Sequence, residues 1–333
     1  MKALHQRQYG SPDFLEIREV DKPVPEKHQL LIKVHAVSIN DWDWALLNGT
    51  PFVPNRLMAG LFKPKMIVGS DIAGRVEAVG SDVTKFKPGD EVYGDLSSCG
   101  FGGFAEFVCA DENAVMTKPP AMSFEQAAAI PQAGMLALQG LMAGEPLKHG
   151  QSILVNGAGG GVGSIVIQLL KPHQVEVTGV DSADKLAAMR SWGFDQVIDY
   201  NEQDFTRNAQ RYDLILDVKT HRAPAEYERV LHPNGVYATV GGSMWGLLRI
   251  ALSGLRIGRA SGKKLCVIQL KPNRDLDYFN ELFEADKFKP VLDKMYDFTE
   301  SEVRDAFHYF GAGAHIGKVV VRMNHEGHNF ENH

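Results

Sequence analysis

The hydrophobic positions of the chain form two different patterns. Up to about residue 120, apolar residues occur in short β-rich runs separated by glycine and proline turns. The runs at 30–34 and 74–80 are typical of strands, and 86–94 predicts a turn followed by a strand. This part of the chain is therefore predicted to form strands and turns in a predominantly β domain.

From residue 122 onward, helical and extended patterns alternate. Residues 123–144 have a helical pattern with a break at Pro131. After it, strands are predicted at 152–156, 175–181, 196–200, 213–218 and 236–240. Helices are predicted between them, at 161–171, 182–192 and 223–231. Such alternation is typical of parallel βαβ units in a doubly wound sheet. A helix at 300–309 and a strand at 317–322 predict a return to the first domain.

Composition narrows the class of protein. The 333 residues suffice for two domains, and 44% hydrophobic residues suffice for a buried core. We find no apolar run of about 18 residues and no apolar signal core, so we expect neither a transmembrane helix nor a secretion signal. The net charge of −6 argues against nucleic-acid binding. Three cysteines without CxxC spacing, expected as small buried residues, indicate a reducing, cytoplasmic compartment.

A glycine string follows the first strand of the alternating part. Residues 156–163 read Asn-Gly-Ala-Gly-Gly-Gly-Val-Gly, directly between an apolar strand and an apolar helix. Glycine lets the chain turn sharply, lets the backbone approach a pyrophosphate and lets the helix pack closely. The first-turn amides then stabilise the phosphate charge, so this context predicts a dinucleotide-binding loop rather than a turn without a ligand. The predicted loop contacts are Ala158, Gly159, Gly160, Gly161, Val162 and Gly163.

The end of the next strand carries residues that would distinguish NAD from NADP. Asp181, 18 positions after Gly163, can accept hydrogen bonds from both ribose hydroxyls of NAD and repels a 2′-phosphate. Its alternative role is a helix N-cap. Ser182, Lys185 and Tyr200 lie near the same region, and Lys185 either pairs with a 2′-phosphate or is a solvated helix residue. The two signals conflict, so the sequence leaves NADH and NADPH open.

Two later strand ends add predicted cofactor contacts. Open α/β sheets bind ligands at the carboxyl ends of their strands. Val218 and Gly241 lie at or directly after the ends of the strands predicted at 213–218 and 236–240. We therefore assign both residues to the cofactor edge of the sheet, with plain turns as the alternative.

Further stretches, together with the glycine string, carry a family resemblance. They cover much of the chain, at 37–49, 68–80, 86–94, 102–106, 197–200 and 317–321. With them the chain resembles the medium-chain dehydrogenase/reductase superfamily, and within it the zinc-free quinone oxidoreductase branch. The resemblance implies an α/β fold with a GroES-like β-rich catalytic domain (1–121 and 268–333) and a Rossmann domain with a doubly wound parallel sheet (122–267). It also implies an active site in the cleft and a homodimer.

The resemblance decides which chemistry we expect. Zinc alcohol dehydrogenases of this superfamily have Cys where this chain has Asn40, and Gly-His-Glu where it has Gly69, Ser70 and Asp71. Their four spaced cysteines correspond here to 97–100, so we expect no metal site. Without a zinc Lewis acid, the favourable reaction is hydride transfer to an electron-poor acceptor, a quinone or an α,β-unsaturated carbonyl.

Two residues of the first domain are assigned to catalysis. The Asn40 amide is expected to hold the acceptor oxygen or the nicotinamide region. Asp43 is expected to orient Asn40 or nearby backbone, with an acid role as the alternative. Trp42 and Trp44 either form an aromatic wall for a flat acceptor or pack in the core. The tyrosine that the family often has two residues after Asp43 is Ala45 here, so the acceptor stays open.

A basic segment from 229 to 274 contains no Asp or Glu. Within it, 245–252 have an amphipathic helical pattern, and Arg249 and Arg256 lie seven residues apart on one face. Such a helix is typical of a contact with an anionic membrane surface or of a cover over a cofactor phosphate. The alternative is a cleft or dimer helix whose arginines pair with acidic residues elsewhere.

Together these observations predict a zinc-independent oxidoreductase that uses NADPH or NADH to reduce a quinone or an α,β-unsaturated carbonyl. The alternatives are an alcohol dehydrogenase or carbonyl reductase of the same superfamily, and a non-enzymatic protein that binds the cofactor. We expect a cytoplasmic homodimer that binds no nucleic acid and contacts a membrane surface at most weakly.

Overall fold

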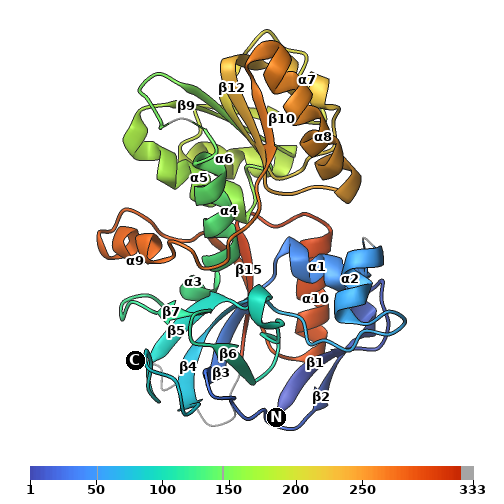
Figure 1. Ribbon diagram of the computed structural model, residues 1–333, viewed down its shortest axis with the longest axis vertical. Helices are drawn as coiled ribbons and strands as arrows, with labels where there is room; N and C mark the ends of the chain where they lie inside the picture. Colours follow the sequence, from blue (N-terminus) through green and yellow to red (C-terminus); the bar gives the residue numbers. More distant parts are fainter. Residues whose placement is uncertain (51, 145, 324–333) are drawn as a thin grey trace. The chain divides into compact units, whose positions relative to one another are not determined.

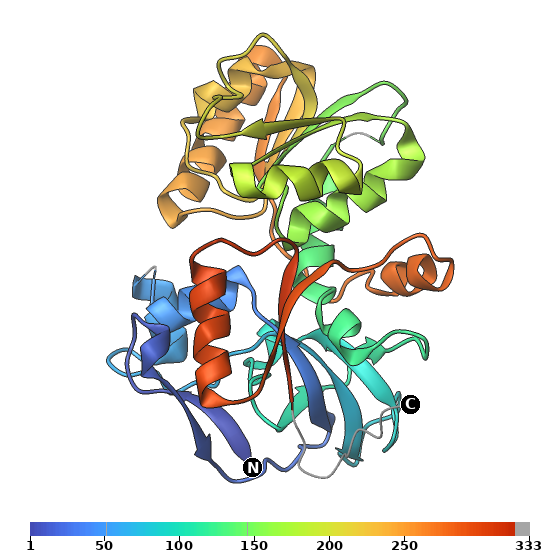
Figure 2. The same ribbon diagram turned by 180° about the vertical axis from the view of Figure 1, so that it is seen from behind.

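The computed structural model describes residues 1–50, 52–144 and 146–323, which divide into two compact units (Figure 1; from behind, Figure 2). Unit 1 contains Met1–Gln132, Asp275–Glu284 and the described chain from Leu292 onward. Unit 2 contains Ala133–Arg274 and Ala285–Val291. The family resemblance implies divisions after residues 121 and 267.

Unit 1 is built on a mixed sheet with the strand order β14-β15-β3-β4-β5-β7, in which β6 also pairs with β3. A separate antiparallel pair is formed by β1 and β2. The strands are β1 (Lys2–Gln6), β2 (Leu15–Glu19), β3 (Gln29–Ser38), β4 (Asp71–Val79), β5 (Glu91–Asp95), β6 (Phe107–Asp111), β7 (Met116–Thr117), β14 (Leu292–Asp297) and β15 (Lys318–Arg322). The helices are α1 (Asp41–Asn48), α2 (Phe52–Ala59), α3 (Phe124–Ala128), α9 (Asp277–Glu284) and α10 (Glu300–Gly311).

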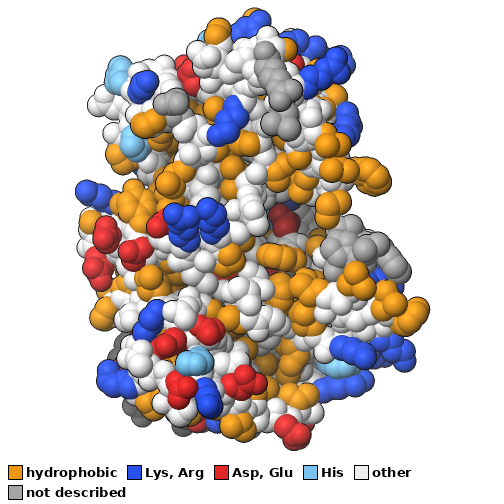
Figure 3. Space-filling model, viewed as in Figure 1, with side chains coloured by type: hydrophobic (Ala, Val, Ile, Leu, Met, Phe, Trp, Pro, Cys, Tyr) orange, Lys and Arg blue, Asp and Glu red, His pale blue; other side chains and the backbone are white. Residues whose placement is uncertain are grey.

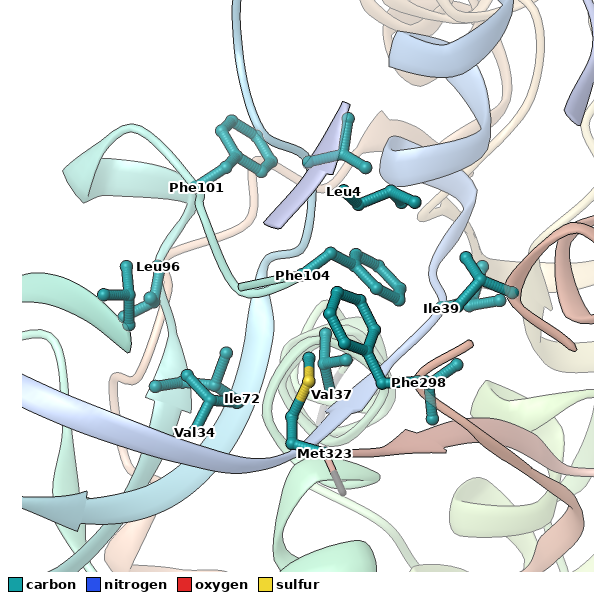
Figure 4. Close-up of a cluster of buried hydrophobic side chains, with 14 of the residues drawn as sticks. Leu4, Val34, Val37, Ile39, Ile72, Leu96, Phe101, Phe104, Phe298 and Met323 are labelled. Carbon is teal, nitrogen blue, oxygen red and sulfur yellow. The ribbon is translucent and has the colours of Figure 1, made fainter. Parts of the chain in front are cut away.

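The core of unit 1 joins its N-terminal strands to its C-terminal segment. Helix α10 buries residues spaced three and four apart, among them Val303, Phe307 and Phe310, and Phe307 packs 5.3 Å from Phe104 between ring centroids. Figure 4 shows part of this core, with the labelled side chains Leu4, Val34, Val37, Ile39, Ile72, Leu96, Phe101, Phe104, Phe298 and Met323. Burial of these apolar side chains therefore fixes the late strands β14 and β15 on the early sheet.

This arrangement places the start of β15 beside the end of β3. The two strands are antiparallel, with Val320 opposite Ser38. The Ile39 N–H donates to the Val319 carbonyl at 3.0 Å. Lys318 therefore lies next to the chain where it leaves β3.

Unit 2 contains a parallel sheet with the strand order β10-β9-β8-β11-β12-β13. The strands are β8 (Ser152–Asn156), β9 (Glu176–Asp181), β10 (Gln196–Asp199), β11 (Tyr212–Asp217), β12 (Leu231–Thr239) and β13 (Lys264–Val267). The helices are α4 (Pro131–Leu141), within which unit 2 begins, α5 (Gly161–Leu170), α6 (Leu186–Trp192), α7 (Pro224–Arg229) and α8 (Met244–Ser261). Strand order reverses between β8 and β11, the switch point at which open α/β sheets bind ligands.

The predicted α/β fold class is confirmed, since one unit is rich in β-strands and the other is a doubly wound parallel sheet. All the elements predicted between 152 and 240 are present. The helix predicted at 182–192 begins with a 3₁₀ turn at Ala183–Lys185, and β12 begins at Leu231 rather than 236. The expectation of strands and turns was wrong for α1 and α2. Asp43 accepts the Asn40 N–H across the first turn of α1, a hydrogen bond that is typical of a helix start.

The cysteines and the helix lengths bear on two expectations from composition. Cys99, Cys109 and Cys266 are free and half-buried, so they are less buried than expected. Burial raises the pKa of the Cys109 and Cys266 thiols, which keeps them protonated and weakly nucleophilic. No helix within the described ranges is both long and apolar enough to cross a membrane.

Candidate functional site

The glycine string forms a tight turn between β8 and α5. Gly157 has a φ of 85°, in the left-handed region that favours glycine. The N–H groups of Gly157 and Ala158 donate to the Val180 carbonyl on β9, at 2.9 and 3.1 Å. A Cβ atom on Gly163 would overlap the carbonyl oxygen of Ala158. Glycine at this position therefore lets the first turn of α5 approach the loop closely.

The start of α5 has the chemistry of an anion site. The first N–H groups of a helix have no acceptor within the helix. Helix α5 begins at Gly161 after an extended Gly160, and no side chain caps it. Its first-turn amides and the positive end of its dipole can therefore bind a phosphate. The structure brings the predicted loop residues together in this turn, so they fit the pyrophosphate of a dinucleotide.

Asp181, at the carboxyl end of β9, is held by three groups. Its Oδ2 accepts the Gly159 N–H at 2.8 Å, and its Oδ1 accepts the Ser182 N–H at 2.9 Å. The Lys185 Nζ lies 3.6 Å from Oδ1. Lys185 is only 5% exposed, so the alternative that it is a solvated helix residue is wrong. Tyr200 is exposed nearby, and its N–H donates to the Asp181 carbonyl at 3.2 Å.

The carboxyl ends of β8, β11 and β12 are joined by buried hydrogen bonds. Asp217 accepts the Asn156 Nδ2–H at 2.8 Å and the Tyr237 hydroxyl at 2.7 Å. Burial raises the pKa of Tyr237 well above its ordinary range, and the Asp217 carboxylate adds to this shift. The hydroxyl therefore stays a donor. Sequence reasoning missed this network. The signal that could have indicated it is the presence of polar side chains in or directly after apolar strands.

Val218 and Gly241 lie against each other at the same edge. A Cβ atom on Gly241 would lie 2.6 Å from the Val218 carbonyl oxygen, and one on Gly157 would lie 3.1 Å from Val218 Cβ. All the cofactor residues predicted in unit 2 thus lie at the carboxyl edge of the sheet. A hollow of about 490 Å³ lies instead at the amino ends of β11 and β12, lined by residues 206–211, Glu226, Arg229 and Val230.

In unit 1, Asn40 belongs to a buried polar cluster with Lys318. The Lys318 Nζ donates to Asn40 Oδ1 and, at 3.5 Å, to the Ile39 carbonyl. The Asn40 Nδ2 donates to Ser70 Oγ at 3.2 Å. Both ends of the Asn40 amide are therefore engaged by the protein. A hydrogen bond with the Asn40 side chain also lowers the pKa of Asp71, against the larger effect of burial.

Asp43 links α1 to two neighbouring segments. It is fully buried, and its two carboxylate oxygens accept the N–H groups of Asn40 at 3.0 Å and Gly69 at 2.9 Å. Burial raises the pKa of Asp43 to about 7, although both hydrogen bonds and the Lys318 ammonium act in the opposite direction. The geometry gives Asp43 contacts that orient the backbone at Asn40.

Several buried carboxyl groups act on the Lys318 ammonium. Its Nζ lies 3.9 Å from Asp71 Oδ2, which also accepts the Gln132 N–H at 3.0 Å. Burial raises the pKa of Asp71 to about 8 and also raises that of Asp95. Burial lowers the pKa of Lys318, and the carboxylates oppose this shift. The cluster therefore carries less charge than the same groups would carry in water.

The donors of this cluster do not suit a catalytic zinc ion. Asn40 Oδ1 and Ser70 Oγ are neutral oxygen atoms, and Asp71 supplies a carboxylate. A catalytic zinc ion usually has three thiolate, imidazole or carboxylate ligands. The Lys318 ammonium bound to Asn40 would also repel a second cation. Within the described ranges, no group of three or more His, Cys, Asp or Glu side chains is arranged to hold a metal.

Sequence reasoning missed Lys318 as a site residue, because it was treated only as part of a strand. A lysine within the apolar stretch at 317–321 was the available signal. Trp42 and Trp44 are both half-buried against the core of unit 1. Trp42 meets Phe101 edge-on at 5.5 Å, and the Trp44 ring occupies the space beside Gly311. Both tryptophans therefore pack against the core, and a role as an aromatic wall for the acceptor stays a prediction.

Comparisons with known proteins cover both units. Residues 26–120 match the family model of the alcohol dehydrogenase GroES-like domain, and 192–321 match that of the zinc-binding dehydrogenases. The chain is 33% identical to a 2-methylene-furan-3-one reductase from Solanum lycopersicum, and the matched region covers 96% of this chain and 79% of that protein. The same identity and coverage apply to a chloroplastic NADPH-dependent alkenal/one oxidoreductase from Arabidopsis thaliana. The solved quinone oxidoreductase from Coxiella burnetii superposes with a TM-score of 0.85 at 29% identity, covering 97% of this chain and 99% of that one.

Proposed function

Since the chain belongs to the quinone oxidoreductase branch of the medium-chain dehydrogenase/reductase superfamily, we propose that it is a zinc-independent oxidoreductase that transfers hydride from NADPH or NADH to a quinone or an α,β-unsaturated carbonyl. The observation that carries this proposal is the carboxyl edge of unit 2, where the glycine loop fits a dinucleotide. The relatives are named for acting on a furanone, on alkenals or enones, and on a quinone. These acceptors share one property, since hydride addition gives a delocalised anion.

The cofactor is held mainly by backbone groups. The N–H groups of Gly161, Val162 and Gly163, in the first turn of α5, would hold the pyrophosphate, supported by the dipole of the helix. Val218 and Gly241 pack closely against each other next to the loop. The bound nicotinamide supplies the hydride. The protein supplies position and exclusion of water.

The pairing of Lys185 with Asp181 supports the use of NADPH. An isolated carboxylate at this position repels a 2′-phosphate. Here the ammonium lies 3.6 Å from the carboxylate, which weakens that repulsion and offers the phosphate a cation. One relative is named as NADPH-dependent. We therefore propose that the protein accepts NADPH, with NADH as the alternative donor.

Asn40 is the residue of unit 1 that we assign to the acceptor. Hydride addition places negative charge on the acceptor oxygen, to which the Asn40 amide can donate in exchange for its bond to Ser70. The Lys318 ammonium polarises this amide through its Oδ1, and Asp43 holds its backbone. A donor aimed at developing charge typically contributes about 3 kcal/mol. Lys318 and Asp43 are thus positioning residues, and water supplies the proton that completes the product.

The remaining proposals concern partners and compartment. We propose a cytoplasmic homodimer, with weak contact to a membrane surface and no nucleic-acid partner. The three free thiols support a reducing compartment, and the net charge of −6 argues against nucleic acid. The homodimer is carried over from the resemblance to the family.

The test is oxidation of NADPH and of NADH by chelator-treated protein, with a small quinone and an enone offered in parallel. We expect turnover that the chelator does not reduce. Asn40→Ala should lower kcat/KM by about 100-fold with cofactor affinity unchanged. The matched control is Asn113→Ala, an exposed loop asparagine of the same unit, which should leave both values unchanged.

Other outcomes would overturn the proposal. Activity that appears only on alcohols or simple ketones after zinc is added would identify an alcohol dehydrogenase. Cofactor binding without turnover on any acceptor would identify a non-enzymatic cofactor-binding protein.

A further inference from the structure

Helix α8 has one face packed on unit 2. This face carries Ile250, Gly254 and Ile257, spaced four and three residues apart. Ile250 is fully buried, and Ile257 packs against the same core. A Cβ atom on Gly254 would overlap the carbonyl oxygen of Leu265 on β13. The helix therefore cannot rotate to bury its other face without losing this close packing.

The opposite face of α8 exposes a row of apolar side chains. Trp245, Leu248 and Leu252 are 75%, 43% and 69% exposed. Because they are spaced three and four residues apart, they form a single ridge along the helix. Met244 is also exposed, in the first turn. Single exposed apolar residues are ordinary, but a continuous row indicates a surface that binds something.

The same face is positively charged. Arg249 and Arg256 are exposed beside the ridge, and in the part of the chain that the structure describes neither forms an ion pair. Neither arginine therefore has an acidic partner among the described residues of its own chain. Lys263 and Lys264, just after the helix, donate to the backbone carbonyls of Glu228 and Ala143. Figure 3 shows basic and hydrophobic side chains next to each other over α8, on the right of the view.

We propose that the outer face of α8 docks on an anionic membrane surface, with its apolar ridge among the lipid headgroups and its two arginines at the lipid phosphates. Tryptophan and leucine beside arginine are the composition of helices that lie in the plane of the interface. The whole segment from 229 to 274 lacks Asp and Glu, so nothing on it repels anionic lipid. Docking would bring the protein to apolar acceptors dissolved in the bilayer.

A second copy of this chain is the less favourable occupant. Two copies that met through this face around a twofold axis would bring arginine against arginine. No carboxylate of the segment 229–274 is present to compensate. Charge complementarity therefore favours a polyanionic surface.

The experiment is co-sedimentation of the full chain with large vesicles at low salt. One set contains phosphatidylcholine with about 30% phosphatidylglycerol, and the other contains phosphatidylcholine alone. We expect binding to the anionic vesicles that is at least about tenfold stronger than to the neutral ones and that salt weakens. The double variants Arg249→Glu/Arg256→Glu and Trp245→Ser/Leu252→Ser should each lose about tenfold or more.

The matched control is Lys171→Glu/Arg190→Glu, which makes the same charge change at exposed residues at and beyond the ends of α5 and α6. It should bind within about twofold of the unchanged protein, since these residues lie outside the proposed face. Vesicle binding needs no turnover, so the result is independent of the proposed reaction.

Three results would overturn the proposal. The first is no binding to anionic vesicles at low salt. The second is an equal loss in the control, which would show that only net charge matters. The third is light scattering that finds a dimer for the unchanged protein and a monomer for the α8 variants, which would make this face an interface between copies.

Discussion

The carboxyl edge of unit 2 and the polar cluster of unit 1 are built in opposite ways. In the glycine loop of unit 2, the contacts join residues within a few tens of positions, such as Gly159 to Asp181, and the donors are backbone groups. In the cluster of unit 1, Asn40 meets Lys318 across 278 positions of the chain, and side chains make the contacts. A site made from backbone groups in a short segment leaves a motif in the sequence, whereas a cluster assembled from distant side chains does not.

The two sites also differ in what holds them in place. Close steric contacts fix the glycine loop, and these contacts involve no buried charge. The cluster contains buried ionisable groups, whose charges are stabilised only by one another and by hydrogen bonds. Changes in the cluster should therefore affect stability first, and changes in the loop should affect cofactor binding first.

The strongest test of this difference is Lys318→Met. Removing the ammonium leaves buried carboxyl groups without their cation, which should lower the free energy of unfolding by about 3–5 kcal/mol. Urea unfolding near neutral pH measures this loss. The control is Lys87→Met, since the Lys87–Asp90 pair at 2.9 Å is largely exposed and should contribute less than about 1 kcal/mol. Equal effects of the two variants would contradict the assigned role of Lys318.

The corresponding change in the loop is Gly163→Ala. The added methyl group would overlap the Ala158 carbonyl oxygen, so the loop must shift away from its phosphate-binding geometry. We expect roughly 100-fold weaker cofactor binding by calorimetry, with the circular dichroism spectrum retained. Gly144→Ala is the control, because its nearest neighbours lie 3.9 Å away. Unchanged affinity in Gly163→Ala would show that the close packing is not needed for the ligand.

The pH dependence of stability gives a third test, at Asp43. Its pKa is raised to about 7 in the folded protein and is about 3.9 in an unfolded chain. Between these values the folded state binds more protons, so this group's stabilisation is present at low pH and is lost as the pH rises through about 7. Its contribution falls by up to about 1.4 kcal/mol per pH unit. Asp43→Asn removes it, so unfolding free energies at about pH 5 and 6 should differ less than in the unchanged protein.

The slope is the informative quantity for Asp43→Asn. The variant also loses stability at every pH, because an amide cannot accept both backbone N–H groups. Asp41→Asn, at an exposed residue in the same turn, should leave the slope unchanged. Parallel slopes in Asp43→Asn and the unchanged protein would mean that Asp43 titrates normally.

The smallest expected effect concerns cofactor preference. Asp181→Asn removes the carboxylate and frees Lys185 from its partner. We expect the ratio of NADH to NADPH dissociation constants to rise roughly fivefold in favour of NADPH. The control is Asp184→Asn, at an exposed acid of the same 3₁₀ turn. A shift toward NADH would overturn the assignment of this edge to the ribose.

Local pattern predicted most of unit 2. Apolar runs and helical patterns, with glycine and proline at the boundaries, located the strands and helices between 152 and 240 within about five residues. The strand β13 was missed, and α8 extends nine residues beyond the predicted helix. The same approach missed α1, although Asn40 and Asp43 have the spacing of a helix start. The helix was missed because the surrounding sequence is typical of strands, although the spacing of Asn40 and Asp43 correctly indicates a helix start.

The sequence by itself determined the doubly wound sheet, the dinucleotide loop and the acid after the second strand, because each depends on neighbours within a few tens of residues. Only the tertiary structure decided that Lys185 is buried against Asp181, that Tyr237 donates to Asp217, and that Lys318 holds Asn40. The physical reason is that desolvation and pairing of buried polar groups depend on which distant segments pack together. Strand β15 reaches β3 through the hydrophobic core of unit 1, and that packing places an ammonium group beside the Asn40 amide.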